Sequence, residues 1–259
     1  MFVRVSTKQS IIFWLMVLIS LVIWMSIPYK LFDISLPIIL ICSLSFLVEK
    51  PSKLRYFLTG LIVGLAAVFG RNHGLYGAVG SIGIMLYLIL KRENAANIIT
   101  AFSFWSLGVI VGYLPVIIFL VVVPGFAMAF WESIREVFIF KATNITLPVP
   151  WPWRLSFGKL SNVEMLREMI TGFGFLANIA FGILGIFWVK YQRLNKRVTS
   201  PIFVASVFLA LPYAHYAFSR ADLTHLAGSM PPLVMGIFAV LADKSNKIKW
   251  PFAALFCGV

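Results

Sequence analysis

A series of long apolar runs constrains this sequence more than any other feature, because short polar or basic segments separate each run from the next. A helix needs about 20 residues to cross the hydrocarbon core of a bilayer, and shorter helices suffice where neighbouring helices bury them. Eight runs qualify, near residues 11–28, 34–49, 56–70, 74–90, 98–123, 170–189, 201–218 and 227–242. A ninth starts at Trp250, and the sequence ends within it at Val259. We therefore predict an all-α fold, a polytopic transmembrane helix bundle with about eight to nine spans.

The overall composition supports a membrane protein. A water-soluble domain carries about 25% charged residues, whereas this chain carries 12%, together with 61% hydrophobic residues. A net charge of +13 would also suit a nucleic-acid-binding protein. The basic residues, however, form short clusters between apolar runs and no stripe interleaved with aromatic residues, so we predict a lipid bilayer as partner and no nucleic acid. Cys42 and Cys257 both fall in or at the end of apolar runs, which argues against a disulfide framework.

The distribution of basic residues predicts the orientation of the chain. Cytoplasmic segments of membrane proteins are enriched in lysine and arginine. If the N-terminus is cytoplasmic, eight alternating spans place most of the 22 basic residues on the cytoplasmic side. The same alternation places residues 71–73, 124–169 and 219–226 together on the outside. We predict an integral membrane protein with one transmembrane domain over residues 1–259 and an extracytoplasmic loop at 124–169.

The external loop at 124–169 contains two amphipathic patterns and an aromatic segment. Residues 126–140 carry mixed charges among apolar positions, as in a helix lying in the membrane interface, and a similar charge pattern recurs at 164–168. Between them, alternating prolines hold an extended segment that presents Trp151, Trp153 and Arg154. These three side chains could contact a sugar or a lipid phosphate at the interface. An aromatic belt that anchors the loop is the commoner use of tryptophan at this depth.

Two polar clusters at the predicted outer surface are candidate binding sites. Arg71 and His73 follow one apolar run, and Arg220, Asp222 and His225 follow another. Two guanidinium groups on one side of the membrane suit a phosphate or pyrophosphate headgroup, although a simple helix-end anchor explains Arg71 equally well. Asp222 and His225 are three residues apart, so on a helix the carboxylate could orient the imidazole. Alternatively, Asp222 caps the following helix, or the whole cluster is a polar turn at the bilayer edge.

Several kinds of catalytic site are missing from the sequence. No Asp-x-Asp or Glu-x-Asp pair occurs, and the three histidines are scattered, so we predict no metal site and no cofactor. Asp33 is the only carboxylate of the short first external loop. A general base needs a second positioned group, so Asp33 alone is weak evidence for catalysis. No catalytic residue is assigned from the sequence.

Two stretches resemble a known enzyme family. Residues 64–77, which read Gly-Leu-Ala-Ala-Val-Phe-Gly-Arg-Asn-His-Gly-Leu-Tyr-Gly, and residues 219–225 with Pro231 and Pro232 behind them, resemble the later membrane segments of bacterial polytopic glycosyltransferases of the GT-C class. The resemblance implies sugar transfer from a polyprenyl-phosphate donor to a glycan or lipid acceptor, on the extracytoplasmic face of the bacterial plasma membrane, in cell-envelope glycan assembly. The lipid-phosphate contacts that it implies are Arg71, His73, Arg220, Asp222 and His225.

The sequence departs from that family at its first external loop. In the family this loop is large and carries the catalytic carboxylate, whereas here it covers only about residues 28–33. The resemblance therefore implies the C-terminal portion of such a protein, incomplete at both ends and without the N-terminal catalytic loop, and leaves enzymatic activity open. The alternatives are a transporter or flippase of a lipid-linked or anionic substrate and a non-catalytic membrane scaffold. We find no internal repeat, which disfavours the transporter.

Overall fold

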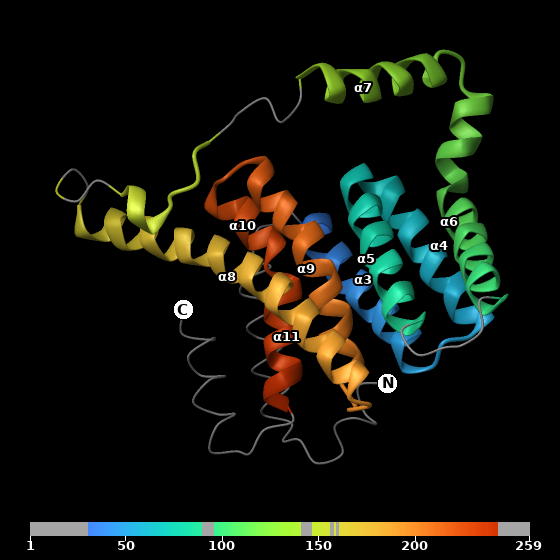
Figure 1. The fold of residues 1–259 in the computed structure, drawn as a ribbon. Coiled ribbons are helices and arrows are strands. Elements are labelled where there is room, and N and C mark those ends of the chain that lie inside the picture. The colour runs from blue at the N-terminus through green and yellow to red at the C-terminus, as the bar shows by residue number, and fades with distance from the viewer. Residues whose placement is uncertain (1–30, 90–95, 141–146, 156–157, 159–160, 243–259) are drawn as a thin grey trace.

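The computed structural model describes residues 31–89, 96–140, 147–155, 158 and 161–242, and the regular structure within these ranges is entirely helical (Figure 1). The helices are α3 (Leu31–Glu49), α4 (Lys53–Phe69), α5 (Arg71–Ile89), α6 (Ala96–Val122), α7 (Phe126–Phe140), the short 3₁₀ helix η2 (Pro152–Arg154), α8 (Asn162–Leu194), α9 (Pro201–Ser219), α10 (Leu223–Ser229) and α11 (Pro231–Ala242). The predicted all-α fold is confirmed for the described part of the chain.

The predicted number of spans is not confirmed. Four described helices, α3, α6, α8 and α9, are long and apolar enough to cross a membrane. The pair α10 and α11, bent by 47° at Met230, adds a fifth if it is one broken span. α4 has only 17 residues, and α5 begins with the polar residues Arg71, Asn72 and His73, which lower its apolar content. The runs predicted at 11–28 and from Trp250 lie outside the described residues.

α9 is the central helix of the bundle. It packs against α3, α5, α8, α10 and α11 (Figure 1). Side chains around its whole circumference are buried, including Val204, Val207, Leu209 and Tyr213. A helix that is apolar all round is expected in the interior of a bundle, because no face of it prefers water. Each end of α9 therefore lies among the ends of neighbouring helices.

Glycines join α4 to α6 at very short range. A Cβ atom on Gly60 would lie 2.0 Å from the Trp105 carbonyl oxygen, and one on Gly108 would lie 2.0 Å from the Phe57 carbonyl oxygen. Gly64 and Gly112, one turn further along, make the same kind of approach. Glycines four residues apart lie on one face of a helix and let two helix backbones approach this closely. Gly60 and Gly64 on α4 thus face Gly108 and Gly112 on α6, and we call this contact the glycine seam.

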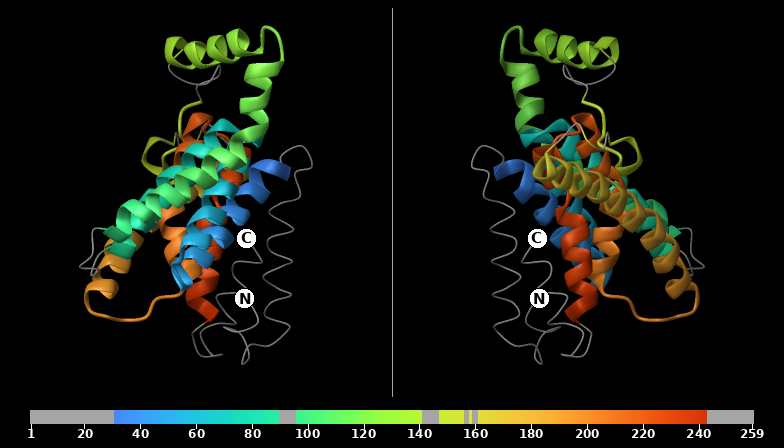
Figure 2. Two further views of the ribbon diagram at one scale, coloured as in Figure 1. Left: turned by 90° about the vertical axis from the view of Figure 1, so that its right-hand side faces the viewer. Right: turned by 90° about the vertical axis from the view of Figure 1, so that its left-hand side faces the viewer.

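The segment between α6 and α8 begins with a helix, α7, that lies outside the main bundle (Figure 1). α6 remains helical through Pro115, and α7 then crosses above the bundle on its own (Figures 1 and 2). The amphipathic helix predicted at 126–140 is α7. The second amphipathic pattern, at 164–168, does not form a separate helix, because a capping box between Ser161 and Glu164 starts α8 there and the helix continues for 33 residues.

Candidate functional site

Three helix ends meet at one end of the bundle and bring polar side chains together. Asp33 lies in the first turn of α3, His73 in the first turn of α5 and Tyr216 in the last turn of α9. A tight turn at Gly70 joins α4 to α5. A Cβ atom at this position would lie 2.8 Å from Cδ2 of His73, so glycine leaves the space that the imidazole ring occupies.

Asp33, His73, Tyr213 and Tyr216 form a continuous hydrogen-bond chain. The imidazole of His73 contacts Asp33 Oδ1 through Nε2 at 3.0 Å and the Tyr213 hydroxyl through Nδ1 at 3.0 Å. The Tyr216 hydroxyl donates to the second carboxylate oxygen, Oδ2 of Asp33, at 2.8 Å. Because an ionised carboxylate only accepts, Nε2 carries the proton, and in the neutral ring Nδ1 accepts from Tyr213.

Burial differs sharply along this chain. Tyr213 is fully buried, and His73 is 4% exposed. The side chain of Asp33 is 26% exposed. Both carboxylate oxygens are therefore held by residues of the protein interior, and the side chain as a whole remains partly exposed. This is the arrangement in which a carboxylate can accept a proton from a bound molecule.

A second histidine–aspartate pair lies between α9 and α10. Asp222 Oδ1 accepts from the backbone N–H of His225 at 2.8 Å and from its Nδ1 at 2.7 Å. Both interpretations of the sequence hold, since Asp222 is the N-cap of α10 and also orients the imidazole. Because Nδ1 must carry a proton to donate to the carboxylate, the basic nitrogen of the neutral ring is Nε2.

Arg220 lies beside the second histidine–aspartate pair. Its Nε lies 2.9 Å from Asp222 Oδ2, which is ion-pair distance, although the N–H direction does not meet hydrogen-bond geometry. Burial alone raises the pKa of Asp222, but hydrogen bonds from the His225 backbone and ring, with the charges of His225 and Arg220, outweigh it and hold the pKa below its ordinary value. The Arg220 side chain is 43% exposed, so its charge remains available to an anion.

Tyr216 links the two pairs. Its hydroxyl binds Asp33, and its ring stacks on the ring of His225 with a centroid separation of 5.3 Å. The remaining histidine, His215, contacts the Tyr76 hydroxyl through Nδ1 at 2.9 Å, and Tyr76 packs edge-on against Tyr213 at 5.1 Å. All three histidines of the chain thus belong to one polar and aromatic cluster at this end of the bundle.

The predicted contacts at Arg71 and at the tryptophan segment are placed differently. Arg71 donates to the Ser133 hydroxyl of α7 at 3.0 Å, and no described contact joins it to Arg220. A joint clamp of the two arginines therefore stays a prediction. Trp151 is half-buried against Phe175 and Phe218, as an anchoring residue would be.

The exposed part of the tryptophan segment lies beside the end of α9. Trp153 is 66% exposed and stacks on Trp151 with a centroid separation of 5.2 Å and an interplanar angle of 6°. Arg154, at the end of η2, is also exposed. The contact of Trp151 with Phe218, two residues before Arg220, brings this segment next to the second histidine–aspartate pair. Trp153 and Arg154 remain candidates for contacts with a sugar or a lipid phosphate.

The sequence assigned His73, Arg220, Asp222 and His225 to this region but not Asp33, Tyr213 and Tyr216. The apolar pattern placed Asp33 in the first external loop, directly before the apolar run at 34–49, whereas α3 begins at Leu31 and includes it in its first turn. A charged residue at the edge of an apolar run was the available signal. Among the described residues, no group of three histidine, cysteine or acidic side chains could hold a metal ion. Comparison of the chain with protein-family models, with curated proteins and with solved structures finds no match in any of the three.

Proposed function

We propose that this protein is an integral membrane glycosyltransferase that transfers a sugar from a polyprenyl-phosphate donor to a glycan or lipid acceptor on the extracytoplasmic face of a bacterial plasma membrane. One observation carries the proposal. Asp33 is a partly exposed carboxylate held by His73 and Tyr216, and Tyr216 connects it to Arg220 through the stacked His225 and Asp222. Sugar transfer needs a base for the acceptor and a cation for the departing phosphate, and the cluster offers both.

In the proposed reaction, Asp33 removes the proton from the acceptor hydroxyl. The acceptor oxygen then forms a bond to the anomeric carbon as the bond from that carbon to the phosphate oxygen breaks. The lipid phosphate leaves with the electron pair, and the guanidinium of Arg220 stabilises its negative charge. This is an inverting displacement. It assigns the base to a residue that the sequence alone offered only as an isolated carboxylate.

The outer faces of the helices support the proposal that the protein lies in a bilayer. Large apolar side chains are exposed along α6 and α8, among them Val121 at 80%, Leu184 at 65% and Phe187 at 67%. Contiguous exposed apolar surface of this kind is unfavourable in water and ordinary against lipid. We therefore propose membrane insertion with a cytoplasmic N-terminus, which places Asp33 and Arg220 outside.

The test is sugar transfer in membranes that carry single variants. Asp33→Asn keeps the size of the side chain but removes the basic oxygen, and we expect at least about a hundredfold loss of rate, the usual contribution of a general base. Arg220→Ala should abolish transfer and leave membrane insertion intact. The matched controls, Glu136→Gln and Arg135→Ala, change exposed charges on α7 and should leave the rate unchanged. Undiminished transfer by Asp33→Asn or Arg220→Ala would overturn the proposal.

The hydrogen-bond chain itself favours a second candidate, a transporter or flippase of a lipid-linked or anionic substrate. A buried tyrosine, a histidine and an aspartate in series are typical of proton relays in transporters. The same membranes distinguish the two functions. If the protein moves the lipid-linked sugar across the vesicle membrane without transferring the sugar, and Asp33→Asn loses this movement, the protein is a transporter.

A further inference from the structure

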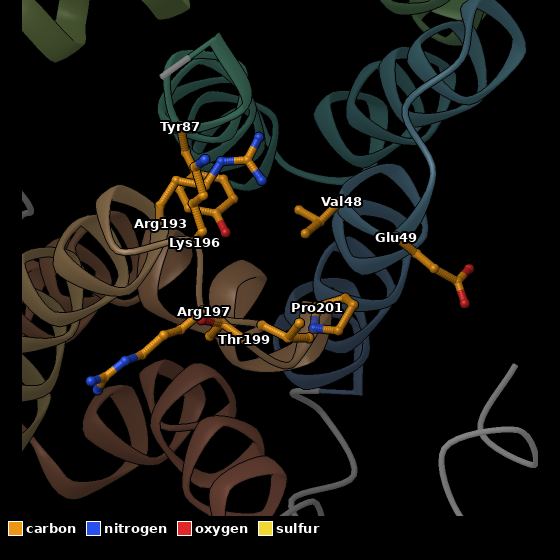
Figure 3. Close-up of a pocket in the computed structure, with 9 residues that line it drawn as sticks. Val48, Glu49, Tyr87, Arg193, Lys196, Arg197, Thr199 and Pro201 are labelled. Carbon is orange, nitrogen blue, oxygen red and sulfur yellow. The ribbon is translucent and has the colours of Figure 1, made fainter. Parts of the chain in front are cut away.

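A basic pocket lies at the end of the bundle opposite the Asp33 cluster. It has a volume of about 610 Å³, and its lining includes Glu49, Tyr87, Arg193, Lys196, Arg197, Thr199 and Pro201 (Figure 3). These residues come from the last turns of α3, α5 and α8, from the connection between α8 and α9, and from the first residue of α9. Asp33, His73 and Tyr216 occupy the other ends of α3, α5 and α9, and a helix of 19 residues, such as α9, spans about 28 Å.

The charge around the pocket is positive. Three of its residues are basic, and the single carboxylate, Glu49, pairs with Arg55 at 3.2 Å. Figure 3 shows the Glu49 carboxylate directed away from the cavity, whereas Arg193 and Lys196 lie with Tyr87 along one side of it. Arg197 lines the pocket with its stem, and its guanidinium group extends away. An anion in the cavity therefore meets Arg193 and Lys196 first.

Arg193 is held in place but retains an unused donor. Its guanidinium lies over the Tyr87 ring, with 5.0 Å from Cζ to the ring centroid, and Nη2 donates to the Leu88 carbonyl oxygen at 3.4 Å. Its Nε is buried and has no partner among the described residues, and the same holds for the Thr199 hydroxyl. A buried polar group without a partner destabilises the fold unless a ligand supplies one. The preference of cytoplasmic segments for basic residues explains the charges but not these two unused groups.

The start of α9 adds a third contribution. Ser200 is the N-cap of α9, but its side chain makes no capping hydrogen bond, and Pro201 occupies the first turn. The first amide groups of the helix therefore lack a side-chain acceptor, and the helix dipole places partial positive charge at this end. Thr199 and Pro201 line the pocket, so the end of the helix contributes to its wall.

Lys196 is held in a costly backbone conformation. Its φ of 56° is left-handed, a region that residues other than glycine rarely adopt. The turn is nevertheless well formed, because Lys196 N–H donates to the Arg193 carbonyl oxygen at 3.2 Å and Arg197 N–H donates to that of Gln192 at 2.9 Å. The basic residues are therefore presented from an ordered turn.

We propose that this pocket binds a phosphate-bearing anion, with the phosphate against Arg193, Lys196, Thr199 and the start of α9. Clefts that bind small molecules have volumes of about 300–1,000 Å³, so the cavity is large enough for more than one phosphate group. Two sources share this chemistry, the headgroup of an anionic phospholipid and a free phosphate or pyrophosphate. The site is separate from the Asp33 cluster, and the proposal does not depend on the transferase function.

The experiment uses the full chain in nanodiscs of phosphatidylcholine and records its thermal unfolding. Replacing part of the lipid with phosphatidylglycerol, or adding inorganic phosphate or pyrophosphate, should raise the Tm through ligand binding. Arg193→Gln and Thr199→Val should weaken the response, with at least about a tenfold rise in Kd for the arginine variant, since hydrogen bonds to charged groups contribute about 1.5–3 kcal/mol.

Lys190→Gln is the matched control, because it removes a basic residue of α8 that does not line the pocket. It should respond like the wild type. A response to phosphatidylglycerol alone identifies a lipid headgroup, and a response to inorganic phosphate or pyrophosphate in pure phosphatidylcholine identifies a free anion. The proposal is overturned if no probe raises the Tm of the wild type, or if Arg193→Gln and Thr199→Val respond as the wild type does. Circular dichroism confirms that each variant is folded.

Discussion

At the scale of single residues, the two histidine–aspartate pairs are built differently. The His73 pair is tied into the interior through Tyr213, whereas the His225 pair sits on a helix cap and is flanked by Arg220. The buried pair is suited to holding a carboxylate in one orientation. The capped pair, with the exposed Arg220 beside it, is suited to binding an anion.

Asp222 predicts a specific pH dependence of stability. Its pKa is lower in the folded chain than in the unfolded chain, where an aspartate has a pKa of about 3.9, so the unfolded state binds the proton more readily. The stabilisation is fully present above the unfolded-state pKa and is lost as the pH falls through the lower folded-state pKa. We expect the Tm in detergent to fall more steeply below about pH 4 in the wild type than in Asp222→Asn.

The cap itself provides the control for this experiment. The amide oxygen that Asp222→Asn introduces would still accept from the His225 backbone N–H, so the difference in stability between this variant and the wild type should shrink as the pH falls below the folded-state pKa of Asp222. Asp222→Ala, in contrast, should be about 1 kcal/mol less stable than Asp222→Asn at every pH, because alanine cannot cap the helix. Equal slopes for the wild type and Asp222→Asn in acid would show that the carboxylate charge adds nothing to folding.

At the scale of helices, the seam between α4 and α6 is the most sensitive contact. A methyl group at Gly108 would lie 2.0 Å from the Phe57 carbonyl oxygen, and the backbone cannot move aside as a flexible side chain can. We expect Gly108→Ala to cost about 1–3 kcal/mol, as overpacking does, and to lower the Tm. Ser103→Leu adds a larger group to an exposed position of α6 and should have little effect. A Gly108→Ala protein as stable as the wild type would show that the helices are further apart.

Local patterns predicted the helices well and the site only in part. Apolar runs located α3, α4, α5, α6 and α9 to within a few residues, because periodicity and polar ends are local properties. The Asp222 contact with His225 was predictable for the same reason, since the two residues are three positions apart. Asp33 and Tyr216 are 183 positions apart, and their contact depends on how α3 and α9 pack, which no short pattern encodes. α8 was predicted too short because its amphipathic first turns resembled a separate helix.

At the scale of the whole molecule, the two polar ends should lie on opposite sides of the membrane. Single cysteines at positions 153 and 197, in a chain whose Cys42 and Cys257 are replaced by serine, report this directly. We expect a membrane-impermeant maleimide to label Trp153→Cys in intact cells and Arg197→Cys only after permeabilisation, because the basic end belongs inside. Labelling of both positions in intact cells would contradict the proposed orientation.

The glycine seam also has a mechanical consequence. Two helices in backbone contact have no layer of side chains between them to absorb movement, so α4 and α6 act as one stiff plate. α7 follows α6 after a short turn at Gly125 and carries Ser133, the partner of Arg71. A tilt of α4 should therefore move α6 with it, and with α6 the turn at Gly125 from which α7 starts.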